Sequence, residues 1–173
     1  MSLAVTFSTI PEMFLNLTDL YAHEERPLFM RKVEGQFQPL RYGDMRTQVA
    51  MFFHGLLKLG VRRGDRVALV SENRPEWVIT DQAVLFHGAV NVPIFPSQTA
   101  KQIEFILRDA GASVVVVSNR YQLSKIERIR DDVPSLKHVI VMNELDDRPD
   151  NVLSFAEVLA SGASDHQQHP HAL

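Results

Sequence analysis

The hydrophobic positions of this chain follow two alternating patterns from residue 66 onward. Short, uninterrupted apolar runs alternate with longer segments in which apolar residues recur at helical spacing. Uninterrupted apolar strands joined by amphipathic helices are typical of a parallel sheet that helices cover on both faces. We therefore predict an α/β fold with a mostly parallel sheet flanked by helices. The predicted strands are RVALV (66–70), VNVPI (90–94), SVVVV (113–117) and HVIVM (138–142).

The segments that follow these strands are predicted to be helices. In the clearest case, residues 101–110, the apolar side chains share one face and Gly111 closes the helix. Each helix start carries a polar side chain three residues before a Glu or Gln, the spacing of a reciprocal N-terminal cap. The predicted helices are 74–88, 99–111, 119–132 and 154–162, and the capping pairs are Asn73 with Glu76, Thr99 with Gln102, Asn119 with Gln122, and Ser154 with Glu157.

The first 60 residues predict two helices and a hairpin. A capped helix is predicted from Thr9 to Tyr21. Two runs, 27–33 and 36–42, flank a Glu-Gly pair and predict a β-hairpin. A second helix follows at 43–60 and ends in a glycine cap. Its predicted inward stripe is Met45, Val49, Phe52, Phe53, Leu56 and Leu57.

One α/β unit accounts for the chain as far as Gly162. A chain of 173 residues is long enough to bury the core of one domain. The last stretch, ASDHQQHPHAL, carries no apolar periodicity. We therefore predict an N-terminal α/β subdomain at 1–162 and a flexible tail at 163–173.

The composition excludes several classes of function. Lys and Arg number 18 against 21 Asp and Glu, for a net charge of −3 without a long basic block, which is unlike a nucleic-acid-binding surface. The absence of cysteine excludes disulfides, thiolate metal sites and thiol nucleophiles. The N-terminus does not resemble a secretory signal, and no run reaches the roughly 18 apolar residues that span a bilayer. We predict a cytoplasmic protein.

The turn after the first of these strands, SENRPEW (71–77), lies where many α/β proteins bind nucleotides. A dinucleotide site needs G-x-G-x-x-G there, and a P-loop needs G-x-x-x-x-G-K-[ST], because glycine lets the backbone approach phosphate. This turn has no glycine. The predicted Asn73–Glu76 cap also occupies N–H groups that a phosphate would use. We interpret the turn as structural.

The remaining polar residues form no catalytic or metal-binding pattern. His166, His169 and His171 lie in the predicted tail without a carboxylate scaffold, whereas His54 and His87 lie in apolar helical segments and are expected to be hydrogen-bonded structural residues. Ser118 follows a strand but lacks a G-x-S-x-G elbow. Solvated charge is expected for the carboxylates at turns and helix faces: Asp65, Asp81, Glu104, Asp109, Asp131 and Asp132.

The loop NVPIFPSQT (91–99) is the strongest remaining candidate for a binding surface. Pro93 and Pro96 stiffen it, and Phe95 offers apolar area. The loop either lines a pocket, packs on another subdomain, or serves only as a rigid strand-to-helix connection.

Several stretches together carry a resemblance to a known family. They are TIPEMFLNLTDLYAHEERP, LRYGDMRTQVAMFFHGLLKLGVRRGDRVAL and SENRPEWVITDQAVLFHGAVNVPIFPS, continued by SVVVVSNRYQLSKI and LKHVIVMNELDD. From Thr9 to Gly162 the chain resembles the N-terminal region of AMP-forming long-chain fatty-acid–CoA ligases, which are adenylate-forming enzymes. The resemblance implies the N-terminal subdomain of the adenylate-forming fold.

The same resemblance implies a parent enzyme that uses ATP and Mg²⁺ to convert a fatty acid to an acyl-adenylate and then transfers the acyl group to coenzyme A. The family's phosphate-binding loop, of the kind YTSGTTGxPKG, has no match in this chain, and neither do its later adenylate-binding motifs or its lysine-bearing segment. We therefore assign no catalytic, cofactor-binding or metal-binding residue.

The expectation is an inactive N-terminal fragment whose partners are the remaining subdomains of the same enzyme. A homodimer and a peripheral association of the parent with membranes are left open, as is the preferred acyl chain length. The alternative is a stand-alone, non-catalytic α/β interaction module derived from the same family.

Overall fold

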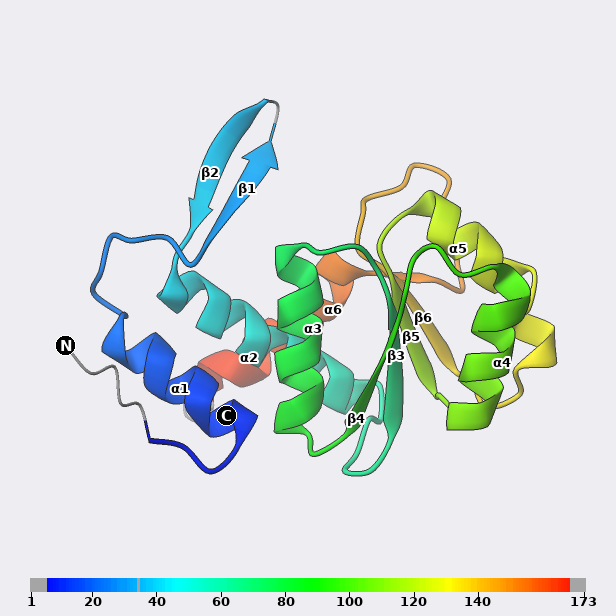
Figure 1. Ribbon diagram of the computed structural model, residues 1–173, viewed down its shortest axis with the longest axis horizontal. Coiled ribbons are helices and arrows are strands. Elements are labelled where there is room, and N and C mark those ends of the chain that lie inside the picture. The colour runs from blue at the N-terminus through cyan, green and yellow to red at the C-terminus, as the bar shows by residue number, and fades with distance from the viewer. Residues whose placement is uncertain (1–5, 34, 169–173) are drawn as a thin grey trace.

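The computed structural model describes residues 6–33 and 35–168, and it confirms the predicted α/β architecture (Figure 1). Its main sheet is parallel, with the strand order β4-β3-β5-β6-β7. Val67 of β3, the second strand in this order, pairs with Asn91 of β4 on one side and with Val114 of β5 on the other. The strands are β3 (Arg66–Val70), β4 (Val90–Ile94), β5 (Val114–Val117), β6 (His138–Val141) and β7 (Leu153–Ser154).

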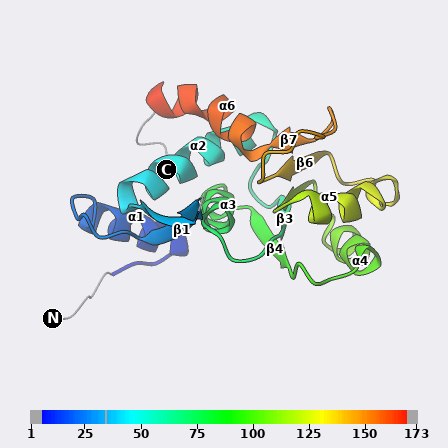
Figure 2. The ribbon, with the colours of Figure 1, turned by 90° about the horizontal axis from the view of Figure 1, so that it is seen from above.

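Successive side chains of β3 point to opposite faces of the sheet and enter two separate cores. Val67 and Leu69 pack with α2, α3 and α6, whereas Ala68 and Val70 pack with α4 and α5. Figure 2 shows these two helical layers on either side of the sheet. The helices are α2 (Tyr42–Lys58), α3 (Pro75–Phe86), α4 (Ala100–Ala110), α5 (Arg120–Glu127) and α6 (Phe155–Gln168).

The N-terminal elements also form as predicted. Helix α1 (Ile10–Leu20) is capped by Thr9, whose Oγ1 accepts a hydrogen bond from the Glu12 N–H at 3.2 Å. It packs against α2 and α3. The hairpin of β1 (Phe29–Val33) and β2 (Gln36–Leu40) projects from the body of the molecule (Figure 1).

The end of the last helix was predicted wrongly. Helix α6 does not stop at Gly162 but continues to Gln168, so residues 163–168 of the predicted flexible tail are helical, and residues 169–173 lie outside the described part. The extension is held by α2: the Lys58 ammonium forms an ion pair with Asp165 at 3.2 Å. Apolar periodicity could not reveal it, because the contact uses glycine and charged side chains rather than an apolar stripe.

Three other details differ from the predictions. The predicted helix 119–132 is interrupted: α5 ends at Glu127, and a short 3₁₀ helix, η1, follows at Arg130–Asp132. Leu57 is exposed, because it lies at the border of a stripe whose centre is formed by residues such as Phe52 and Leu56. Strand β7 was not predicted, since two residues carry no pattern.

Among the described residues, no helix combines the length and the apolar composition that a membrane span requires.

Candidate functional site

The carboxyl edge of the sheet brings together polar residues from two adjacent strands. The connection from β3 leads to β4 on one side, whereas β5 lies on the other side of β3, and this reversal of strand order is where α/β sheets commonly bind ligands. Glu72 follows β3 and accepts hydrogen bonds from Ser118 Oγ at 2.7 Å and from Asn119 Nδ2 at 3.3 Å. Ser118 thus orients Glu72 and is not arranged as a nucleophile.

These contacts keep Glu72 ionised. Burial acts to raise its pKa, but hydrogen bonds from Ser118, from its own backbone N–H and from Asn119, together with the charge of Arg74, outweigh burial and hold the pKa of Glu72 below its ordinary value. Glu72 therefore carries a negative charge at neutral pH.

Replacing Ser118 by alanine is expected to raise the pKa of Glu72. The Ser118→Ala variant removes a donor to the charged carboxylate and leaves the desolvation in place. Carboxyl ¹³C NMR titration measures this pKa directly. Ser124→Ala is the matched control, because that hydroxyl donates only to the Tyr121 carbonyl. An unchanged Glu72 pKa in Ser118→Ala would contradict the assignment.

The start of α3 is held by ion pairs and not by the predicted cap. The N-cap residue is Arg74 and makes no side-chain cap bond, so the Asn73–Glu76 capping pair was predicted wrongly. Arg74 Nε instead donates to Glu76 Oε2 at 2.8 Å, and Arg31 of the hairpin donates to Glu76 Oε1. Pro75 explains the difference, because its fixed φ favours the first helical position and so places the N-cap at Arg74 rather than at Asn73.

Arg74 also joins α3 to the carboxyl edge. Its Nη1 donates to Asn143 Oδ1 at 2.8 Å and to the Ser118 carbonyl at 3.3 Å. Glu76 is 6% exposed. Burial acts to raise its pKa, but the hydrogen bond from Arg74, a backbone hydrogen bond and the charges of Arg74 and Arg31 keep it below its ordinary value.

The other three predicted N-caps are confirmed, and the predicted return bond is present at Thr99 and Ser154. At Asn119 the return bond did not form as predicted, because the Gln122 side chain donates to the Pro96 carbonyl instead. Thr99 Oγ1 accepts from the Gln102 N–H at 3.3 Å, and Asn119 Oδ1 accepts from the Gln122 N–H at 3.1 Å. Ser154 Oγ accepts from the Glu157 N–H at 3.1 Å.

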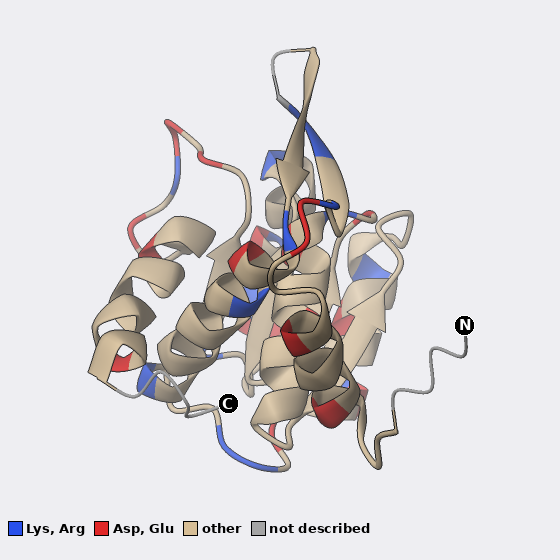
Figure 3. Cartoon of the chain, turned by 90° about the vertical axis from the view of Figure 1, so that its left-hand side faces the viewer, with Lys and Arg blue, Asp and Glu red and all other residues tan. Residues whose placement is uncertain are grey.

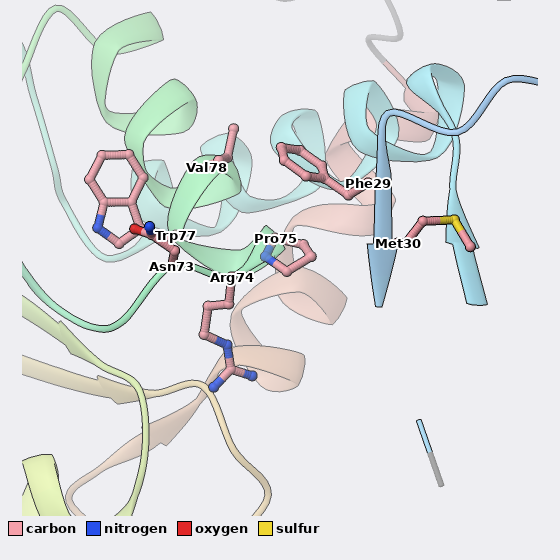
Figure 4. Close-up of a pocket in the computed structure, with 7 residues that line it drawn as sticks. All are labelled: Phe29, Met30, Asn73, Arg74, Pro75, Trp77 and Val78. Carbon is pink, nitrogen blue, oxygen red and sulfur yellow. The ribbon is translucent and has the colours of Figure 1, made fainter. Parts of the chain in front are cut away.

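Two cavities meet at Trp77. One, of about 410 Å³, lies between the start of α3 and the hairpin residues Phe29 and Met30 (Figure 4). Figure 4 shows Arg74 extending away from the hairpin. The other, here called the Trp77 groove, has a volume of about 420 Å³ and runs from Trp77 and Glu72 to Phe95.

The loop 91–99 therefore lines a pocket, which was one of the three interpretations that the sequence left open. The Phe95 side chain is 76% exposed, and Pro93 and Pro96 also line the Trp77 groove. The groove is lined by one carboxylate and by no Lys or Arg.

His87 and His54 occupy structural positions. His87 Nε2 lies 2.9 Å from the Phe53 carbonyl, and its ring stacks on the Phe53 ring, which confirms the structural reading of His87. Burial lowers the pKa of His87. His54 is buried, with its ring edge-on to Phe53, and His166 lies near it at a ring separation of 6.5 Å. His169 and His171 lie outside the described residues.

The described ranges 6–33 and 35–168 contain no cluster of side chains suited to a metal ion. Within them no group of three or more His, Asp or Glu side chains is placed to hold a metal ion. Basic and acidic residues are interspersed over the side shown in Figure 3 rather than gathered in one basic patch.

Two of the carboxylates expected to be solvated, Asp65 and Asp81, are half-buried and have structural partners. Asp65 Oδ2 accepts from the Arg62 N–H at 2.8 Å, and Asp81 Oδ1 accepts from Asn91 Nδ2 at 2.7 Å.

Glu104 contradicts the expectation, because it is 5% exposed and is paired with Lys101 and Arg108. The hydrogen bond from Lys101 lowers its pKa. Asp109, Asp131 and Asp132 are exposed, as expected.

The sequence did not reveal the group formed by Arg31, Arg74 and Glu76. The Arg74–Glu76 spacing of two residues is not that of helical neighbours, and Arg31 lies 45 residues before Glu76. Only the first-turn position of Glu76 gave a signal, and that signal pointed to a cap.

Comparison with known proteins shows what this chain is similar to. The profile of the family described as AMP-binding enzyme matches residues 19–172. A long-chain-fatty-acid–CoA ligase of Mycobacterium bovis is 32% identical over 113 residues, which are 65% of this chain and 19% of that protein. A long-chain-fatty-acid–CoA ligase of Rattus norvegicus is 30% identical over 136 residues, 79% of this chain and 19% of that protein. The chain thus spans about a fifth of the length of these curated relatives.

Solved structures share the fold. The anthranilate CoA ligase AuaEII, solved in complex with anthranoyl-AMP, superposes with a TM-score of 0.78 at 25% identity, covering 89% of this chain and 28% of that one. The acyl-CoA synthetase of Brucella canis superposes with a TM-score of 0.68 at 25% identity, covering 82% of this chain and 26% of that one.

Proposed function

Because the chain belongs to the AMP-binding enzyme family, we propose that it is the N-terminal α/β subdomain of an AMP-forming long-chain fatty-acid–CoA ligase. The observation that carries the proposal is the match of residues 19–172, together with curated relatives that bear this name. The whole enzyme would convert a fatty acid and ATP to an acyl-adenylate in the presence of Mg²⁺ and then form the coenzyme A thioester.

The role proposed for these 173 residues is to build part of the substrate pocket. The Trp77 groove and the start of α3 do not fit a nucleoside triphosphate. The Trp77 groove has an ionised Glu72 and no cationic side chain, and the start of α3 combines Pro75, which lacks an N–H, with the carboxylate of Glu76. Each of these disfavours phosphate. We therefore derive no catalytic step through ATP or Mg²⁺ at these residues.

We expect the isolated chain to bind ATP only weakly. Isothermal titration calorimetry with ATP and Mg²⁺, and with a non-hydrolysable acyl-adenylate analogue, should give no saturable heat at micromolar concentrations. The full-length ligase of Mycobacterium bovis, titrated in the same way, is the positive control. Micromolar affinity of the 173-residue chain for ATP would overturn the scaffold role.

The partners of the whole protein would be the other subdomains of the same enzyme. The whole protein would be located in the cytoplasm and would take its acyl substrate from the membrane surface. Sequencing the gene beyond codon 173 tests this. A reading frame that continues into a Gly/Ser/Thr-rich loop supports the ligase, whereas an immediate stop codon favours a non-catalytic interaction module.

A further inference from the structure

The turn that carries Phe95 is built by backbone hydrogen bonds. The Gln98 N–H donates to the Phe95 carbonyl at 3.0 Å, which closes a tight turn with Pro96 at its second position. The turn joins β4 to α4 at the carboxyl edge of the sheet. Phe95 directly follows Ile94, the last residue of β4, which pairs with Val70 of β3, so the turn begins where this strand pairing ends.

Two buried side chains of α5 donate hydrogen bonds to this turn. Lys125 Nζ donates to the carbonyls of Pro96 and Gln98, both at 2.8 Å, and Gln122 Nε2 donates to the Pro96 carbonyl at 3.1 Å. Lys125 is 6% exposed and Gln122 is 4% exposed. Lys125 Nζ also lies 4.5 Å from the centre of the Tyr121 ring.

The environment of Lys125 is unusual for a buried ammonium group. Within the described residues it forms no ion pair with a carboxylate. Burying a charge is costly unless it is paired and hydrogen-bonded. Here the partners are backbone carbonyls of one turn, so the favourable interactions of Lys125 depend on where that turn lies.

Helix α5 reaches both walls of the groove. Its N-cap, Asn119, donates to Glu72 on the β3 side, and Lys125 and Gln122 bind the turn on the β4 side. One short helix therefore contacts both Glu72 and the turn that carries Phe95. Trp77 also lines the groove.

The charge in the groove restricts what it can hold. Phosphate oxygens would lie near the ionised Glu72 with no Lys or Arg lining the groove to balance them. Trp77, Phe95 and the prolines instead offer apolar and aromatic area. An uncharged apolar chain fits this lining, and a nucleotide does not.

We propose that Lys125 and Gln122 are positioning residues that hold Phe95 at the rim of the Trp77 groove, and that this groove contacts the acyl chain of the substrate rather than its nucleotide. The inference rests on the proposed ligase function for the identity of the substrate. The positioning role itself depends only on the contacts within this chain.

The experiment uses the fluorescence of Trp77, the single tryptophan of the chain. Dodecanoic acid with a nitroxide at its methyl end is titrated below its micelle concentration, because a nitroxide quenches a nearby indole. Unlabelled dodecanoate should reverse the quenching, and AMP or pyrophosphate should not. The variants are Phe95→Ala, at an exposed position, and Lys125→Met, which keeps the aliphatic stem. Lys137→Met, at an exposed lysine, is the charge-matched control.

We expect Lys125→Met and Phe95→Ala to weaken binding of the labelled acid at least about fivefold, the effect of losing one or two net hydrogen bonds or an aromatic contact. Lys137→Met should bind as the original chain does. Hydrogen exchange at Gln98 should accelerate in Lys125→Met while exchange in β5 stays unchanged, which separates a displaced turn from general unfolding.

Three outcomes would overturn the inference. They are no quenching of Trp77 in the original chain, displacement of the labelled acid by AMP or pyrophosphate, and unchanged binding and exchange in Lys125→Met. None of these results bears on thioester formation by the longer enzyme. Failure of the groove assignment is therefore distinguishable from failure of the ligase proposal.

Discussion

Replacing Gly162 by valine is expected to lower the free energy of unfolding by about 3 kcal/mol, at the upper end of the cost of overpacking a core. A Cβ at this position would lie 1.9 Å from the Met51 carbonyl oxygen and 2.7 Å from the Gly55 nitrogen. Both are backbone atoms of α2 and cannot move aside as a flexible side chain would. Helix α6 must therefore shift, and the stacked rings of Phe52 and Phe155, 4.3 Å apart, would separate.

Gly43 provides the matched control for this prediction. It lies in α2, the helix that Gly162 of α6 approaches, but a Cβ at Gly43 would meet no atom within 4 Å. Gly43→Ala should leave stability unchanged or raise it by about 0.5–1 kcal/mol, because alanine has the higher helix propensity. Urea unfolding followed by circular dichroism measures both variants. The close approach of α2 and α6 would be refuted if Gly162→Val lowered the free energy of unfolding by less than the change that Gly43→Ala causes.

Replacing Arg74 by methionine is expected to cost about 3 kcal/mol, the usual effect of removing one partner of a buried ion pair. The substitution leaves Glu76 buried with only Arg31 as a cationic partner, and it removes the donor to Asn143 and to the Ser118 carbonyl. Arg31→Met is the comparison. The Arg31 side chain is 53% exposed, so its loss should cost about 1 kcal/mol or less.

The pH dependence of the Arg74 effect follows from the depressed pKa of Glu76. A carboxyl whose pKa is lower in the folded state contributes stability above its unfolded value, here 4.5, and that contribution is lost as pH falls through the folded value. The difference in unfolding free energy between the original chain and Arg74→Met should therefore shrink below pH 4.5. Urea unfolding at neutral and acidic pH measures this. A difference that does not change with pH would show that Glu76 does not carry the effect.

Much of the fold was predictable because its signals are local. The apolar runs of β3, β4, β5 and β6 and the amphipathic segment of α4 each identify one element without reference to any other. The three confirmed caps, at Thr99, Asn119 and Ser154, are also local, since each joins residues three positions apart. Local signals failed where a distant element decides the outcome, as in the extension of α6 along α2 to Gln168.

The candidate site also combines features that the sequence predicts with contacts that only the tertiary structure reveals. The sequence alone offered a pocket wall as one of three interpretations of the loop that carries Phe95, and it showed that the turn at 71–77 has no glycine for a phosphate. It could not indicate that Arg31, Arg74 and Glu76 meet, or that Lys125 reaches the carbonyls of Pro96 and Gln98. Those contacts join residues brought together only when the strands align at one edge of the sheet. Periodicity and capping act within a few residues of chain, whereas ion pairs and buried donors depend on distances in space.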